Sequence, residues 1–344
     1  MPKQDIYTNE ITVLLSRKRR KGLIVLVAML VATVLIALVS ISLGSLRIPI
    51  GQIVSVLFGD TSGSNALIIL QFRLPRVVAA VLVGAALAIA GSLMQGVIRN
   101  SLASPDLIGV TGGASVAVVA FMTLTANQYS IHWVPVIAVA GAFATAALNY
   151  VLAWKHGLST FRLVLIGIGI STAMGALTTF LLISGPSYLA SQVLGWMTGT
   201  IYGTNWKHIA ALVPYLAVFV PLACLFAYKL NIQALGDVLA TGLGSRMQRD
   251  RFLLLLFSVA LAGVAVGIAG TITFIGLLAP HMARRLVGSD YRILMPVSGF
   301  IGGLILLLAD LAGRMLFQPL DVPAGVFTAG IGAPFFLYLL FRRS

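Results

Sequence analysis

Long, nearly uninterrupted runs of apolar residues occupy most of this chain, and charged residues occur mainly at the junctions between them. Each run approaches the roughly 20 apolar residues that span a hydrocarbon core as a helix, and lacks the polar face of a soluble surface helix. The runs cover residues 23–46, 77–98, 107–125, 133–154, 163–183, 209–228, 294–316 and 325–341. Because lipid offers the backbone no hydrogen-bonding partner, the pattern predicts an all-α polytopic membrane protein.

Residues 252–292 form one further apolar stretch that is long enough for two short passes. Its roughly 40 residues correspond to about 60 Å of helix. Gly270 and Gly276 bracket a break in the middle, and Pro280 disturbs the second limb. The sequence therefore predicts about ten transmembrane helices, of which the eighth is short and irregular. Broken helices at membrane depth occur where they are buried or line a cavity, which favours a transporter.

Basic residues are distributed unequally between the two predicted sides of the membrane. The chain has 23 Lys and Arg residues against 9 Asp and Glu residues, for a formal net charge of +14. With the cluster at residues 17–21 in the cytoplasm, all but five basic residues fall on that side; the exceptions are Arg47, Arg73, Arg76, Lys207 and Arg314. Such an excess is typical of cytoplasmic loops. We therefore expect both termini in the cytoplasm, residues 1–21 as a basic tail, and residues 22–344 as the transmembrane domain.

Several classes of protein are excluded by what the sequence lacks. Its single cysteine, Cys224, lies in an apolar run, which rules out a disulfide framework or a cysteine-based zinc site. The basic residues flank spans without interleaved aromatic residues, so nucleic acid is not an expected partner. The sequence contains no phosphate-binding loop, no carboxylate pair within the spans, and no Ser/His/Asp or HExxH arrangement. We therefore expect no enzyme activity, metal or cofactor in this chain, and a pathway that another protein drives.

Two segments of the chain resemble each other. Residues 82–93 (LVGAALAIAGSL) align without gaps with residues 261–272 (LAGVAVGIAGTI), and six of the twelve positions are identical. The two predicted helices cross the membrane in opposite directions, as in transporters built from inverted repeats. Convergence between two Gly- and Ala-rich membrane helices is the alternative explanation.

Small residues recur at helical spacing on the fifth and the last predicted helix. They are Gly167, Ser171, Gly175 and Thr179 on the former, and Gly325, Ala329 and Ala333 on the latter. Small residues at this spacing let two helix backbones approach closely in lipid. The pattern predicts a contact surface, which either packs inside the subunit or forms a subunit interface or a substrate path.

The predicted cytoplasmic linker near residues 230–251 is longer than a connection between two helices requires. Its sequence, NIQALGDVLATGLGSRMQRDR from residue 231, places glycines around a short helical stretch at residues 237–241. A short helix that is presented to the cytoplasm in this way is a candidate docking element. A solvated amphipathic surface segment is the alternative.

Arg73, Arg76 and Arg314 are exceptions to the cytoplasmic distribution of basic residues. A guanidinium group on the outer surface suits bidentate pairing with a carboxylate of a partner protein. Contact with lipid headgroups is one alternative. Another is an internal pair with Asp310, which lies one helical turn before Arg314.

Five segments carry specific motifs: residues 73–76 (RLPR), 83–115, 270–288, 306–314 (LLLADLAGR) and 323–343. Together they resemble FecCD/BtuC-type permeases of the iron-siderophore/cobalamin ABC importer family, the type II importers. The resemblance extends from about residue 24 to the carboxyl terminus. Ser101 departs from the family pattern Asn-Pro-Leu-Ala-x-Pro at its first proline, which loosens the expected turn after the second helix.

The resemblance implies a ten-helix permease that forms a homo- or heterodimer around a translocation path, framed largely by the fifth and tenth helices. Two separate cytoplasmic ATPase subunits would bind ATP-Mg and drive the permease, and an extracytoplasmic binding protein would deliver the substrate. Membrane lipid is the remaining partner. The expected location is the bacterial cytoplasmic membrane.

The resemblance also implies roles for individual residues. Arg73, Arg76 and Arg314 correspond to arginines that receive glutamates from the two lobes of the binding protein. The segment that corresponds to the coupling helix seated on the ATPase includes Leu235, Gly236, Asp237, Ala240, Gly242, Leu243 and Gly244.

A ferric siderophore is the expected substrate, because it is the commonest cargo of this family. Haem and cobalamin are alternatives within the family. A free-standing secondary transporter is the main rival function, and a membrane-embedded enzyme is a more distant one.

Overall fold

The computed structural model describes residues 2–60, 63, 65–125, 133–155, 157 and 159–342, and every regular element within them is a helix. The long helices are α1 (Pro2–Ser42), α3 (Leu74–Ile98), α5 (Val134–Ala153), α6 (Thr160–Ser184), α8 (Trp206–Gln233), α10 (Met247–Ala269) and α12 (Tyr291–Leu316). The shorter ones are α2 (Ile50–Leu57), η1 (Ile68–Arg73), η2 (Pro105–Ile108), α4 (Val110–Leu124), α7 (Ser187–Met197), α9 (Asp237–Gly242), α11 (Ile275–Val287) and α13 (Ala324–Arg342).

The predicted all-α membrane architecture is confirmed. Within the described residues, 7 helices are long and apolar enough to cross a membrane, and α4 and α13 are shorter apolar helices. With the 13-residue α11, these correspond in order to the ten predicted helices. The predicted break lies between α10 and α11, and α11 is the short helix with Pro280 inside it. The predicted basic tail is helical from Pro2 onward and continues into the first span.

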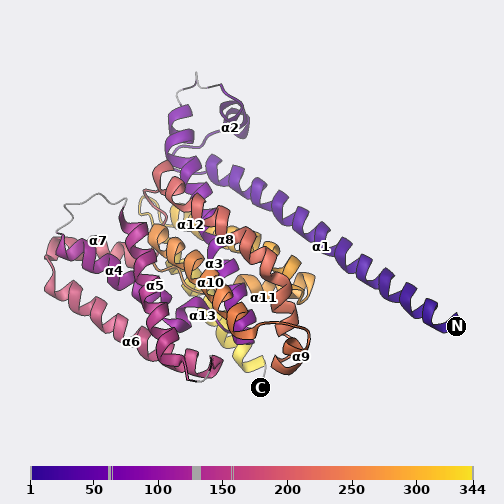
Figure 1. Ribbon diagram of the computed structural model, residues 1–344. Helices are drawn as coiled ribbons and strands as arrows, with labels where there is room; N and C mark the ends of the chain where they lie inside the picture. Colours follow the sequence, from indigo (N-terminus) through magenta and orange to yellow (C-terminus); the bar gives the residue numbers. More distant parts are fainter. Residues whose placement is uncertain are drawn as a thin grey trace.

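Helices α3 and α10 form the centre of the molecule (Figure 1). In the most apolar window of each, 78% and 83% of the residues are buried, against 11% in α6. Glycine makes these tight crossings possible. A methyl group added to Gly91 would overlap the carbonyl oxygen of Gly276 in α11, and one added to Gly84 would overlap that of Gly302 in α12. Backbones in such direct contact leave no room for any side chain.

The two similar segments occupy equivalent places in the fold. Gly84 and Gly263 align in the repeat; Gly84 lies against Gly302 of α12, and a methyl group on Gly263 would meet Ala142 of α5. Thus α3, the second of the ten helices, packs on the ninth, while α10, the seventh, packs on the fourth. In each pair, a repeated helix of one half packs on a helix of the other half in the equivalent way: second on ninth, seventh on fourth. This equivalence favours an internal repeat over chance similarity.

The two ends of the bundle differ. Helix α2 lies at one end, whereas α9 and the last residues of α13 lie at the other (Figure 1). Helix α1 projects away from the bundle toward its amino terminus and packs on α12 where Gly22 meets Ile293. We refer to these ends as the α2 end and the α9 end.

Candidate docking and coupling sites

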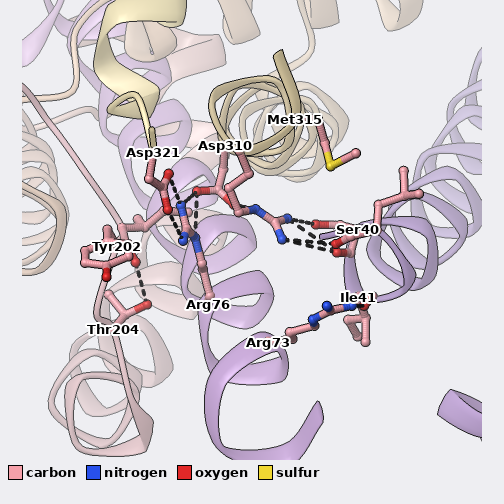
Figure 2. Close-up of polar contacts among 12 residues, drawn as sticks. Ser40, Ile41, Arg73, Arg76, Tyr202, Thr204, Asp310, Met315 and Asp321 are labelled. Carbon is pink, nitrogen blue, oxygen red and sulfur yellow. Dashed lines mark hydrogen bonds and ion pairs between the residues drawn. The ribbon is translucent and has the colours of Figure 1, made fainter. Parts of the chain in front are cut away.

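At the α2 end, Arg76 lies between two carboxylates, as Figure 2 shows. Its Nε donates to Asp310 Oδ1 at 2.9 Å, and its Nη1 and Nη2 donate to the two oxygens of Asp321 at 2.7 and 2.9 Å. The guanidinium carbon also lies 5.4 Å from the centre of the Tyr202 ring. Arg76 stands in the first turn of α3, and Asp321 lies in the loop between α12 and α13. The arginine therefore ties that loop to the central helix.

Asp310 joins Arg76 to the third predicted arginine. Its Oδ2 accepts a hydrogen bond from Arg314 Nε at 3.1 Å, so the pair one helical turn apart that the spacing allowed is present. Arg314 also donates from Nη2 to Ser40 Oγ of α1 at 2.6 Å. Because Asp310 is only 2% exposed, its pairing with two cations offsets the cost of burying its charge.

Arg73 is held differently, by backbone carbonyl groups at the carboxyl end of α1 and in the loop that follows it. Its Nη1 donates to Ile41 and Ser42 at 2.5 and 3.1 Å, and its Nη2 donates to Leu46. No carboxylate in the described part of the chain forms an ion pair with it. Carbonyl dipoles satisfy its N–H donors but leave its net charge uncompensated.

All three arginines line one pocket of about 500 Å³, together with Phe72, Gln318 and Asp321. The fold thus brings together cations that are up to 241 positions apart, in an open concavity on the α2 end. Three guanidinium groups face two carboxylates there, so the pocket is cationic. Its chemistry suits an incoming carboxylate that exchanges with Asp321 or approaches Arg73.

At the α9 end, a six-residue helix presents apolar side chains to solvent. Helix α9 begins after Gly236, whose φ of +101° is readily adopted only by glycine. Ala240 packs inward and is fully buried. The outward side chains are large and apolar; they are Leu235, Val238, Leu239 and Leu243. Val238 is 87% exposed, which for an apolar side chain beside other apolar side chains indicates a contact surface.

Asp237 fastens α9 to both central helices. Its carboxylate pairs with Arg99, which follows α3, and its two oxygens accept from Arg251 Nη2 in α10 at 2.9 and 3.0 Å. The carboxyl end of α3 and the amino end of α10 therefore meet at one residue, so the two helices are antiparallel. Arg99 adopts φ +56°, a left-handed conformation that ends α3 and turns the chain.

The charges around Asp237 alter its protonation. Partial burial alone would raise its pKa, but the hydrogen bond from Arg99 and the charges of Arg251 and Arg99 lower the pKa below its ordinary value of 3.8. A lowered pKa means that the folded protein favours the ionised carboxylate. The stabilisation is therefore present above the ordinary pKa and is lost only as the pH falls through the lowered one.

Asp237→Asn is expected to loosen α9, because it leaves Arg251, whose side chain is only 7% exposed, without its carboxylate. Amide hydrogen exchange in residues 235–245 of the full chain should become about fivefold faster, consistent with the loss of a surface ion pair. Asp237→Glu, which keeps the charge, is the matched control. Unchanged exchange in Asp237→Asn would show that α9 is held by other contacts.

Several residues of this region are not evident from the sequence. Arg99 and Arg251 are ordinary basic residues at span ends, and only the fold shows that both reach Asp237. Lys229 pairs with Asp250 at 3.3 Å, and Ser245 Oγ donates to the same carboxylate at 2.8 Å. Apolar positions between the glycines were the one available signal for the outward face of α9.

The small-residue stripe on α6 is divided between two environments. A methyl group on Gly167 would overlap the Leu107 carbonyl oxygen, and Ser171 Oγ donates to the Asp106 carbonyl at 3.1 Å. Gly175, by contrast, has open space around it, and Thr179 is exposed. The first half of the stripe packs internally, and the second half is available to a partner.

The stripe on α13 is divided in the same way. Gly325 is buried against the turn that follows α7, where its N–H donates to the Gly199 carbonyl at 2.8 Å. Ala329 is half-buried and Ala333 is exposed. Neither stripe carries a polar constellation, and the described residues contain no group of three or more His, Cys, Asp or Glu side chains that could hold a metal ion.

Known proteins are similar to this chain over nearly its whole length. The "Probable siderophore transport system permease protein YfhA" of Bacillus subtilis is 49% identical, over 94% of this chain and 96% of its own length. The achromobactin transport system permease protein CbrC of Dickeya dadantii is 42% identical, over 94% of this chain and 92% of its own length.

A solved structure and a family comparison agree with these relatives. An ABC transporter assigned to the metal-chelate type, solved in an inward-facing conformation, is 28% identical with a TM-score of 0.83, and the match covers 92% of this chain and 98% of that one. The FecCD transport family matches residues 29–342. The resemblance drawn from the motifs is confirmed: the chain is a multi-pass membrane permease that belongs to the FecCD transport family.

Proposed function

We propose that this permease imports a ferric siderophore and is driven by a separate ATP-binding-cassette ATPase. Two observations support the proposal: the chain belongs to a family in which a relative is named a probable siderophore transport permease, and α9 presents an apolar face to solvent. The sequence has no phosphate-binding loop of its own, so nucleotide chemistry must come from a partner.

Helix α9 would dock the ATPase on the cytoplasmic side, and the excess of basic residues on that side supports this orientation. Both termini would then lie in the cytoplasm of a bacterial cell, and residues 1–21 would extend from the first span. The exposed halves of the α6 and α13 stripes, including Gly175 and Ala333, would meet a second permease subunit, either an identical copy or a paralogue.

The arginine pocket would receive carboxylates of an extracytoplasmic binding protein. Arg73 offers a charge without a carboxylate partner, whereas Arg76 already holds Asp321 in a two-point contact. An incoming glutamate that uses Arg76 must displace Asp321. The internal contacts therefore predict that Asp321 competes with the incoming glutamate for Arg76.

Asp321→Asn is expected to strengthen the complex with the binding protein by about threefold to tenfold, because the ion pair between Arg76 and Asp321 no longer competes with the incoming carboxylate. Arg76→Gln should weaken the same complex. Affinity is measured with the purified permease in nanodiscs and its binding protein. Asp60→Asn, which removes one charge from the same end, is the control, and weaker binding by Asp321→Asn would contradict the exchange.

The function itself is tested in proteoliposomes. Permease, ATPase and binding protein together should accumulate radioiron from a ferric siderophore only with ATP, and the permease alone should accumulate none. Uptake that stops when the proton gradient is collapsed at constant ATP would instead favour a secondary transporter. Competition by unlabelled haem or cobalamin would identify those alternative substrates.

A further inference from the structure

A second polar concavity lies at the α9 end, between α1 and the turn that joins α11 to α12. Its volume is about 920 Å³. Among the side chains that the structure describes, five cations line it, and they come from three helices: Lys18, Lys21, Arg284, Arg285 and Arg292. The pocket is separate from α9 itself and from the arginine pocket at the other end of the bundle.

The positive charge of this pocket is not balanced by the carboxylates whose side chains the structure describes. Asp290 is the one carboxylate among the described lining residues, and its Oδ1 already accepts from Asn231 Nδ2 at 2.6 Å and from the Arg292 backbone N–H at 3.0 Å. None of the five cations forms an ion pair with a carboxylate of the described residues. The pocket therefore attracts an anion.

One of the cations is fixed in place by neutral partners. Arg284 donates from Nη1 to Gln95 Oε1 of α3 at 3.2 Å and from Nη2 to the Tyr291 hydroxyl at 3.5 Å. These contacts orient the guanidinium group without neutralising it. Such an arrangement is suited to a phosphate oxygen, which accepts several N–H donors at once.

An apolar groove adjoins the cationic pocket. It has a volume of about 740 Å³, lies between α11, α12 and α13, and shares Arg285 and Leu286 with the pocket. Leu278, Met282 and Ile305 are among its apolar lining residues. A phosphate site that continues into an apolar groove matches the phosphate headgroup and the acyl chain of a phospholipid. A free phosphate would make no contact with the groove.

We propose that this pocket binds the headgroup of an anionic phospholipid, with an acyl chain in the adjoining groove. Basic pockets between membrane helices at the cytoplasmic boundary bind such headgroups. The lipid would join α1 to the α11–α12 turn, where Gly22 and Ile293 make the protein contact. The assignment of the lipid to the cytoplasmic leaflet rests on the membrane orientation proposed above. The proposal that the pocket binds an anionic lipid does not depend on that orientation.

The test uses the purified full chain in detergent, titrated with dioctanoyl phosphatidylglycerol and followed by native mass spectrometry. Arg285→Gln together with Arg292→Gln should weaken binding by about tenfold or more, and the corresponding double change to Lys should retain it. Lys155→Gln together with Arg249→Gln removes two exposed cytoplasmic cations outside the pocket and should leave binding unchanged. Thermal unfolding of each variant establishes that it is folded.

Four results would overturn the proposal. Dioctanoyl phosphatidylcholine could bind as tightly as phosphatidylglycerol, or the control pair could lose as much affinity as the pocket pair. Inorganic phosphate could displace the lipid at similar concentrations, which would indicate a free-phosphate site. Finally, the pocket pair could bind lipid normally but fail to assemble with the ATPase, which would make the pocket a protein interface.

Discussion

Val238→Asp is expected to abolish ATP-driven uptake while leaving the permease folded and in the membrane. Val238 is 87% exposed in this chain, so a charge there meets water and costs the isolated subunit almost nothing. In the proposed complex the same side chain is enclosed by the ATPase, where an unpaired carboxylate loses its hydration. Truncation of a hot-spot residue at the centre of an interface costs about 2 kcal/mol or more, which is roughly thirtyfold in affinity.

The measurement is co-purification of the ATPase with the permease, followed by uptake in proteoliposomes. Lys155→Gln changes the net charge by the same amount at an exposed position outside α9 and should assemble normally. Val238→Ile keeps the apolar surface and should also assemble. Full assembly of Val238→Asp would remove α9 from the interface, and the proposed function would then need a different docking element.

Gly91→Ala is expected to cause a large loss of stability in the chain itself. The added methyl group overlaps the Gly276 carbonyl oxygen, and neither backbone can move away because both belong to packed helices. Overpacking costs typically about 1–3 kcal/mol, and a clash with backbone lies at the upper end of that range. Gly84→Ala, which meets the Gly302 carbonyl, should behave in the same way.

Thermal unfolding in detergent, followed with a thiol-reactive dye, measures this effect, because Cys224 is the single cysteine and is partly buried. Gly169→Ala on α6 is the matched control, since nothing lies within 4 Å of the position. There alanine should be neutral or slightly stabilising, as alanine favours a helix over glycine by about 1 kcal/mol. If Gly91→Ala unfolded at the same midpoint temperature as the wild type, the contact between α3 and α11 at Gly91 and Gly276 would not be as close as described.

The membrane helices could be predicted from sequence because lipid leaves few alternatives. The apolar run at residues 163–183 became α6, Thr160–Ser184. The break predicted near Gly270 and Gly276 lies between α10 and α11, with Gly276 already in the first turn of α11. The helices α2 and α7 were missed. Both are short, and packing of buried residues such as Ile53 and Val193 stabilises them rather than an apolar run.

The candidate sites could be predicted less completely. The sequence singles out Arg73, Arg76, Arg314 and the α9 segment through charge and glycine placement. It does not reveal their partners, because the contact between Arg76 and Asp321 joins residues 245 positions apart. Three backbone carbonyls hold Arg73, and any residue can supply a carbonyl, so no sequence pattern reveals that site. Likewise, spacing on α6 could not tell that Gly167 packs internally while Gly175 does not.

The attachment of α9 through Asp237 has a mechanical consequence. The carboxylate pairs with residues at the adjoining ends of α3 and α10, which are the most buried of the candidate membrane spans. A displacement of α9 is therefore transmitted to α3 and α10 together, rather than absorbed by local bending near Asp237. Close-packed interiors transmit strain. A small displacement of α9 at one face of the membrane should therefore tilt α3 and α10 together and move their ends at the opposite face.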